Sequence, residues 1–194
     1  MQNDRMRAFF DERAATWDTT VRHDAEKIMT IISLAGPLEG KTVLDAACGT
    51  GVLVPHLLSA GAARIVSLDL SPNMIEAAKQ NYSDPRVRFV AGDLFDCSEC
   101  GFDTVFLYSA YPHFLKKEKL FAHIRSLLAP SGRFVIAHSN SRMCINGGHS
   151  GKASDISTPL LPVGEEAARI APWFDIDIQI DTDRLYVLSG IARL

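Results

Sequence analysis

An aspartate followed by a glycine-rich turn is the strongest chemical signal in the chain. Asp45 follows the apolar run 43–44, and Gly49 and Gly51 come shortly after it. The apolar run predicts a strand buried on both faces, and the glycines permit a tight turn that lets a ligand approach the main chain. We expect a helix to begin at about Val52, with N–H groups that have no partner inside the helix. This order of strand, turn and helix predicts a site for a nucleotide-type cofactor.

The charge at this turn indicates which kind of ligand it takes. A dinucleotide-binding turn carries three glycines in the pattern G-x-G-x-x-G, and the third position here is Val54. The carboxylate of Asp45 would also repel a pyrophosphate placed beside it. We therefore expect a ligand with a cationic group near Asp45, with an NAD-dependent oxidoreductase as the rival interpretation.

Two further acids come at the ends of the next apolar runs. Asp69 ends the run 64–69, ahead of a Ser-Pro pair that suits the start of a helix, and Asp93 follows the run 87–91. The carboxyl ends of parallel strands form the edge at which open α/β sheets bind ligands. An isolated acid at such a place is more often a turn residue. Three of them at successive strand ends predict one shared site.

These residues resemble the motifs of the class I S-adenosylmethionine (SAM) methyltransferases, in which an acid, three residues and Gly-x-Gly follow the first strand. The resemblance covers roughly Phe9 to Leu194, with Ser131 replacing the first glycine of the family's turn before the fifth strand. It implies SAM as cofactor and S-adenosylhomocysteine as product. In the family the glycine loop packs on the methionine part of the cofactor, and the first acid helps to hold its amino end.

The same resemblance implies roles for the later acids. Asp69 would accept hydrogen bonds from the ribose hydroxyls, and Asp93 with the residue after it would bind the adenine edge. The expected cofactor-binding residues are Asp45, Ala46, Cys48, Gly49, Gly51, Asp69, Leu70, Asp93, Leu94 and Tyr108.

Alternating strand and helix patterns predict a single α/β domain over residues 1–194. The expected fold is a three-layer, Rossmann-like sandwich around a seven-stranded, mostly parallel sheet with strand seven antiparallel. Aromatic residues at helical spacing predict an amphipathic helix over 6–18, within an N-terminal helical segment 1–35. This segment either packs on the core or forms a lid over the cofactor, as in the similar small-molecule methyltransferases of the ubiquinone and menaquinone biosynthesis type.

Three histidines are candidates for the acid–base work of methyl transfer. His113 follows the fourth strand, His138 ends the fifth, and His149 belongs to a polar, substrate-side loop at 139–162. Histidine is the natural proton acceptor near neutral pH, but positioning alone supplies much of the acceleration of a displacement. Each of these histidines could instead be satisfied by local backbone.

The neighbours of these histidines predict an acceptor site. The sequence Tyr111-Pro112-His113 departs from the (Asn/Asp/Ser)-Pro-Pro-(Tyr/Phe) pattern of enzymes that methylate base amines, which argues against nucleic-acid amine methylation. Arg142 and Asn146 would share one face of a short helix capped by Ser141. The expected substrate-binding residues are Tyr111, Arg142 and Asn146, although Arg142 is also consistent with an ordinary surface arginine.

Metal binding is the alternative use of the same histidines. His113, His138, Cys144 and His149 carry ligand types that suit zinc or iron, but their spacing matches no compact zinc motif. We therefore expect no metal. The lone pair of cysteines in the C-x-x-C at 97–100 gives no stronger signal, and it is read as an incidental loop pair.

Composition limits the remaining choices. The 194 residues carry a net charge of -3, so there is no basic footprint for duplex nucleic acid. No apolar run approaches the roughly 18 residues of a membrane span, and no signal peptide pattern is present, so we expect a cytoplasmic protein. A small-molecule acceptor is the first expectation, and a homodimer stays open. The alternatives are a methyltransferase that acts on RNA or protein with a partner, and a non-catalytic SAM-binding regulatory subunit.

Overall fold

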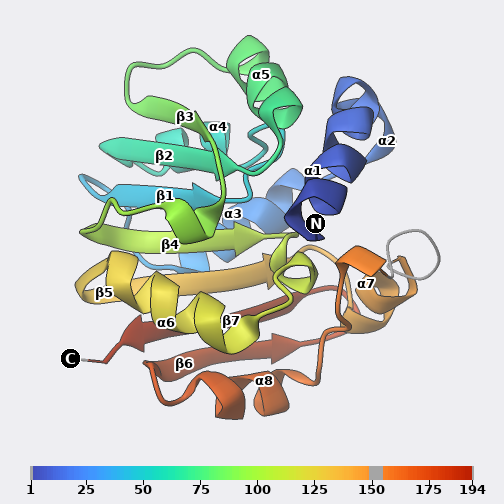
Figure 1. The fold of residues 1–194 in the computed structure, drawn as a ribbon. Coiled ribbons are helices and arrows are strands. Elements are labelled where there is room, and N and C mark those ends of the chain that lie inside the picture. The colour runs from blue at the N-terminus through green and yellow to red at the C-terminus, as the bar shows by residue number, and fades with distance from the viewer. Residues whose placement is uncertain (1, 149–154, 194) are drawn as a thin grey trace. The chain divides into compact units, whose positions relative to one another are not determined.

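The computed structural model describes residues 2–148 and 155–193. The chain divides into two compact units, Met1–Ser98 and Glu99–Leu194, each with its own strands and helices (Figure 1). The structure gives the strands the order β3-β2-β1-β4-β5-β7-β6 in a seven-stranded sheet. The mostly parallel, seven-stranded α/β fold that the sequence predicts is confirmed.

Unit 1 contains three parallel strands in the order β3-β2-β1. The register pairs Asp45 with Ser67 and Asp69 with Ala91, so these strands end close to one line. Helix α5 packs over β2 and β3. The elements of this unit are α1 (Gln2–Arg13), η1 (Ala14–Thr16), α2 (Trp17–Thr20), α3 (Ala25–Leu34), β1 (Thr42–Ala46), α4 (Val54–Ser59), β2 (Arg64–Asp69), α5 (Pro72–Asn81), β3 (Val87–Ala91) and η2 (Leu94–Asp96).

Unit 2 contains one parallel pair and two antiparallel pairs of strands. Strand β4 runs parallel to β5, and β7 lies antiparallel between β5 and β6, as predicted for strand seven. Helix α6 packs on β5 and α8 packs on β6 and β7 (Figure 1). The elements of this unit are β4 (Phe102–Tyr108), η3 (Tyr111–His113), α6 (Lys117–Leu127), β5 (Leu128–His138), α7 (Arg142–Gly148), α8 (Val163–Ile170), β6 (Phe174–Asp181) and β7 (Tyr186–Ala192).

Aromatic side chains make the core of unit 2. The rings of Phe121, Phe134 and Phe174 pack against one another with centroids between 4.5 and 6.2 Å apart. All three side chains are fully buried, and pairs at this spacing stabilise a core beyond their buried area. This cluster fixes α6 on the sheet and therefore holds the segment that precedes it.

Two predicted helices begin or end elsewhere in the structure. The helix predicted over 6–18 is broken, because α1 ends at Arg13 and a 3-10 turn separates it from α2. The aromatic packing still occurs, since Phe10 contacts Trp17 across the break. The helix after the glycine turn begins at Val54 rather than at about Val52, because the chain uses two more residues to complete the turn.

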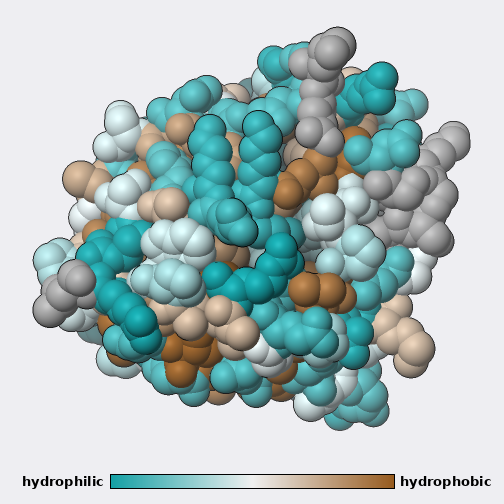
Figure 2. Space-filling view, turned by 60° about the horizontal axis from the view of Figure 1, so that its bottom comes forward, coloured by the Kyte–Doolittle hydropathy of each residue, from teal (hydrophilic) through white to brown (hydrophobic). Residues whose placement is uncertain are grey.

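The outer surface is mainly polar where it can be seen. Figure 2 shows one face on which hydrophilic residues predominate and hydrophobic residues gather in small, separate patches. Within residues 2–148 and 155–193, no helix is long and apolar enough to cross a bilayer.

Candidate cofactor and acceptor sites

The glycine loop after β1 is built from left-handed backbone. Ala47, Gly49 and Gly51 have φ angles of 60°, 55° and 86°. A non-glycine residue in this region is uncommon and is typical of sites where the surrounding structure enforces the conformation. Backbone bonds enforce it here, because Cys48 N–H donates to Leu68 at 3.1 Å and Gly51 N–H donates to the Cys48 carbonyl at 3.0 Å.

The two glycines of this loop serve different purposes. A Cβ on Gly51 would lie 3.0 Å from the Tyr82 ring, so this glycine permits close packing. A Cβ on Gly49 would meet nothing within 4 Å in the described structure, so the main chain at Gly49 faces open space. The described structure therefore leaves space beside the Gly49 Cα.

Asp45 is a buried carboxylate next to this open backbone. Its side chain is 1% exposed, and its Oδ2 has no hydrogen-bond partner among the described residues. Burial raises the pKa of Asp45 to about 7, and the nearby charge of Asp69 adds to the increase. A buried carboxylate of this kind is stabilised by a cationic partner.

Asp69 at the end of β2 holds the glycine loop and the next helix together. One carboxylate oxygen accepts from Gly49 N–H at 2.8 Å, and the other accepts from Ser71 N–H at 2.8 Å. Burial raises the pKa of Asp69 to about 6, although these two bonds oppose the increase. Asp69, the predicted ribose-binding acid, therefore also stabilises the conformation of the glycine loop.

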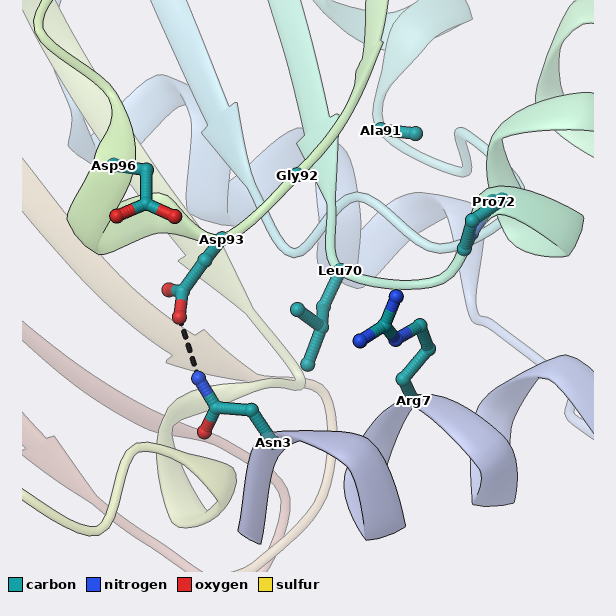
Figure 3. Close-up of a pocket in the computed structure, with 8 residues that line it drawn as sticks. All are labelled: Asn3, Arg7, Leu70, Pro72, Ala91, Gly92, Asp93 and Asp96. Carbon is teal, nitrogen blue, oxygen red and sulfur yellow. Dashed lines mark hydrogen bonds between the residues drawn. The ribbon is translucent and has the colours of Figure 1, made fainter. Parts of the chain in front are cut away.

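A cavity of about 340 Å³ lies beside the ends of β2 and β3. Figure 3 shows Asn3 and Arg7 of α1 on one side of it and Asp93 on another. Asp93 accepts from Phe95 N–H at 3.0 Å and from the Asn3 side-chain amide. The full lining is Asn3, Arg7, Leu70, Pro72, Ala91, Gly92, Asp93 and Asp96. Two predicted cofactor residues, Leu70 and Asp93, line this cavity.

Three predicted cofactor residues lie in the packed interior. Ala46 ends β1 and is completely buried, Cys48 is buried in the glycine loop, and Leu94 is buried at the start of η2. Burial raises the pKa of the Cys48 thiol well above its usual range, which keeps the thiol protonated. These side chains shape the loops, and contact with a ligand at these positions falls to the main chain.

Unit 2 contains three more of the predicted residues, of which His138 and Tyr108 lie at or beside the end of β5. His138 is 1% exposed, and its ring packs edge-on against Tyr186 at a centroid distance of 6.2 Å. The Tyr108 hydroxyl donates to Ser139 Oγ at 2.9 Å. His113 is half-buried in η3, with Nδ1 3.1 Å from the Ile156 carbonyl. Because a carbonyl oxygen only accepts, Nδ1 of His113 carries the proton in this hydrogen bond.

The predicted substrate residues on α7 have structural partners. Ser141 caps this helix by accepting from Cys144 N–H, as expected. The Asn146 side chain donates to the Leu160 carbonyl at 3.0 Å and accepts from Leu160 N–H at 2.8 Å. Arg142 forms an ion pair with Asp181 at 2.8 Å. Asn146 therefore joins two parts of the substrate-side loop, and Arg142 fastens this loop to the end of β6.

The metal alternative gains no support from the described residues. Over 2–148 and 155–193, no three histidine, cysteine, aspartate or glutamate side chains come close enough to hold a metal ion. His149, the third histidine candidate, lies outside the described residues.

A buried charged cluster in unit 2 was missed by the sequence reasoning. The Tyr111 hydroxyl donates to Glu166 at 2.8 Å, and Lys117 donates to the Tyr111 carbonyl with its ammonium 3.5 Å from the Tyr111 ring centroid. Tyr111, predicted to bind substrate, is thus fully buried and anchors η3 to α6 and α8. Burial lowers the pKa of Lys117 to about 7. No sequence pattern links Lys117 to Glu166, because their shared partner Tyr111 brings them together only when α6 and α8 pack around it.

Comparison with known proteins agrees with this geometry. The family described as "Methyltransferase domain" matches residues 43–132. A demethylmenaquinone methyltransferase from Clavibacter sepedonicus is 30% identical over 137 residues, covering 66% of this chain and 56% of that protein. The chain thus spans little more than half the length of this relative.

Solved structures share the fold over nearly the whole chain. A chain in the complex of the Haloferax volcanii Trm112 methyltransferase activator with a methyltransferase has a TM-score of 0.81 at 18% identity, covering 95% of this chain and 98% of that one. The DhpI–SAH complex has a TM-score of 0.76 at 23% identity, covering 96% and 95%. With the acid, glycine and strand-end pattern of unit 1, these findings make the chain similar to the SAM-dependent methyltransferases, in sequence over residues 43–132 and in fold over nearly its whole length.

Proposed function

We propose that the chain binds SAM at the strand ends of unit 1 and transfers its methyl group to a small-molecule acceptor. The observation that carries the proposal is Asp45, a buried carboxylate with a raised pKa and one oxygen without a hydrogen-bond partner among the described residues. Beside it, the backbone at Gly49 is open to a ligand. This pair fits the cationic amino end and the aliphatic chain of a methionine-derived cofactor.

The other cofactor contacts follow from the same loops. Asp69 lies at the end of β2, where it would accept from ribose hydroxyls, and Asp93 lines the cavity that would take the adenine. SAM supplies a sulfonium-bound methyl group, whose bond to sulfur breaks as an acceptor lone pair forms the new bond. The chain's own part is to align the two reactants and to accept a proton where the acceptor carries one.

Residues of unit 2 support the acceptor side of the proposal. His113 and His138 follow the fourth and fifth strands, and their imidazoles are the candidates for accepting the proton. His149 remains a candidate from the sequence. A small-molecule acceptor is supported by the similarity to a protein named demethylmenaquinone methyltransferase.

The structural neighbour in complex with a Trm112 activator favours a second candidate function. In this alternative the chain methylates RNA or protein with a partner subunit. The net charge of -3 supplies no basic surface of its own for RNA, so the partner would have to provide it.

Isotopically labelled SAM, incubated with the chain and a metabolite extract, tests the small-molecule proposal. We expect label in a small molecule, with and without chelator. His113→Ala and His138→Gln should lose most of the product while binding S-adenosylhomocysteine as tightly as the wild type, and His123→Ala on α6 serves as the control. Label that appears only in protein or RNA after addition of a partner would replace this proposal with the second candidate.

A further inference from the structure

The N-terminal segment 2–20 reaches all three loops that follow the strands of unit 1. Asn3 donates to Asp93 after β3, Asp11 accepts from Ser71 after β2, and Asp18 accepts from Thr50 in the glycine loop after β1. These are the loops of the proposed cofactor site.

Two of these three contacts are reinforced by neighbouring bonds. Asp11 also accepts from the backbone N–H of Asn73 at 3.2 Å, and its carbonyl accepts from the Asn73 side chain at 3.2 Å. Asp18 also accepts from Asn81 at 2.9 Å. Asn3 holds Asp93 by a single side-chain bond between exposed groups, so the first turn of α1 is the weakest attachment of the segment.

This weakest attachment lies where the proposed ligand must go. Figure 3 shows the Asn3 amide reaching from α1 to the Asp93 carboxylate at the edge of the cavity. Asp93 Oδ1 accepts from Phe95 N–H, and Oδ2 accepts from the Asn3 amide on the side of the cavity. An exocyclic amine of a purine is a donor of the same kind as the Asn3 amide. Both donors would approach Oδ2 from the cavity.

We propose that Asn3 is an autoinhibitory contact: its amide occupies the Asp93 oxygen that an adenine amine requires, and cofactor binding exchanges one bond for the other. The inference rests on the proposed function. The exchange releases the first turn of α1, whereas Asp11 and Asp18 keep the rest of the segment attached. The N-terminal segment thus lines the adenine cavity, and its first turn moves when the cofactor binds.

Calorimetric titration with S-adenosylhomocysteine tests the exchange. Asn3→Ala removes the competing donor, so the affinity of the chain for S-adenosylhomocysteine should rise by roughly threefold to tenfold, the range expected for one solvent-exposed hydrogen bond. Arg5→Ala, an exposed change on the same helix, should leave the affinity unchanged. The 6-deamino analogue of S-adenosylhomocysteine lacks the amine, so wild type and Asn3→Ala should bind it equally.

The possible failures of this experiment are distinguishable. An Asn3→Ala affinity that is unchanged or weaker overturns the exchange and leaves the proposed function intact. A wild-type chain that does not bind S-adenosylhomocysteine at all contradicts the proposed function and the exchange together.

A second measurement follows the side chain itself. On saturation with S-adenosylhomocysteine, the side-chain amide resonance of Asn3, assigned by its loss in Asn3→Ala, should move towards the value of a solvent-exposed amide. The amide of Asn73, bonded to Asp11, should stay in place as the control. An Asn3 resonance that does not move on saturation overturns the exchange.

Discussion

Asp45 combines complete burial with a carboxylate oxygen that has no hydrogen-bond partner among the described residues. The sequence showed that an acid precedes the glycines, and this is enough to predict a cationic ligand. It could not show how far burial raises the pKa of Asp45, because that depends on the packing around β1 and on the distance to Asp69. The structure therefore adds a pH dependence that the motif alone does not contain.

The affinity for S-adenosylhomocysteine should rise with pH until Asp45 is ionised. Because the pKa of Asp45 in the free chain is about 7, the carboxyl is protonated below this pH and must lose its proton to meet the ligand's ammonium group. We expect an increase of about tenfold between pH 6 and pH 8, levelling above pH 7. Calorimetry over this range should show Asp45→Asn binding more weakly and without this increase. A wild-type affinity that falls across the range would contradict the assignment.

At the scale of elements, η3 is held from both sides by α6 and α8. Tyr111 lies between Lys117 and Glu166, and this cluster fixes the turn that carries His113. Each of these two helices is a local element, because its buried residues recur at helical spacing. The sequence could not predict the cluster, since the approach of Lys117 and Glu166 to Tyr111 from two helices depends on tertiary packing. For the same reason the sequence could not show that Tyr111, a predicted substrate residue, is fully buried in this cluster.

Lys117 should make the free energy of unfolding depend on pH above neutrality. Burial lowers its pKa to about 7 against an ordinary value of 10.5, so between these values the unfolded chain binds a proton that the folded chain lacks. The folded state therefore gains stability as pH rises through this window, by up to about 1.4 kcal/mol per pH unit. Glu166 and Arg169 of α8 are the charged groups that act on Lys117.

Lys117→Met removes this titration. Urea unfolding gives the free energy of unfolding of the wild type and of the variant at pH 7.0 and pH 9.5. The wild type should be more stable, relative to the variant, at pH 9.5 than at pH 7.0. Lys119→Met on the same helix, at an exposed position, is the control. A difference that stays constant would contradict a buried, deprotonating Lys117.

At the scale of the whole molecule, the strand-end acids were predictable because each depends on local sequence. Asp45, Asp69 and Asp93 each end or follow an apolar run that the chain itself defines. The contacts of Asn3, Asp11 and Asp18 were not predictable, since an N-terminal helix can dock in many ways. The resemblance suggested a lid at 1–35, and the structure adds the specific side chains by which the first part of this segment attaches to unit 1.

Calorimetric titration of the chain with S-adenosylhomocysteine, with NAD in parallel, tests the central claim most directly. We predict one site per chain for S-adenosylhomocysteine, weakened at least tenfold in Asp69→Asn, and no binding of NAD. Tight binding of NAD with no response to S-adenosylhomocysteine would contradict the account, because the acids at the strand ends of unit 1 would then serve a different cofactor.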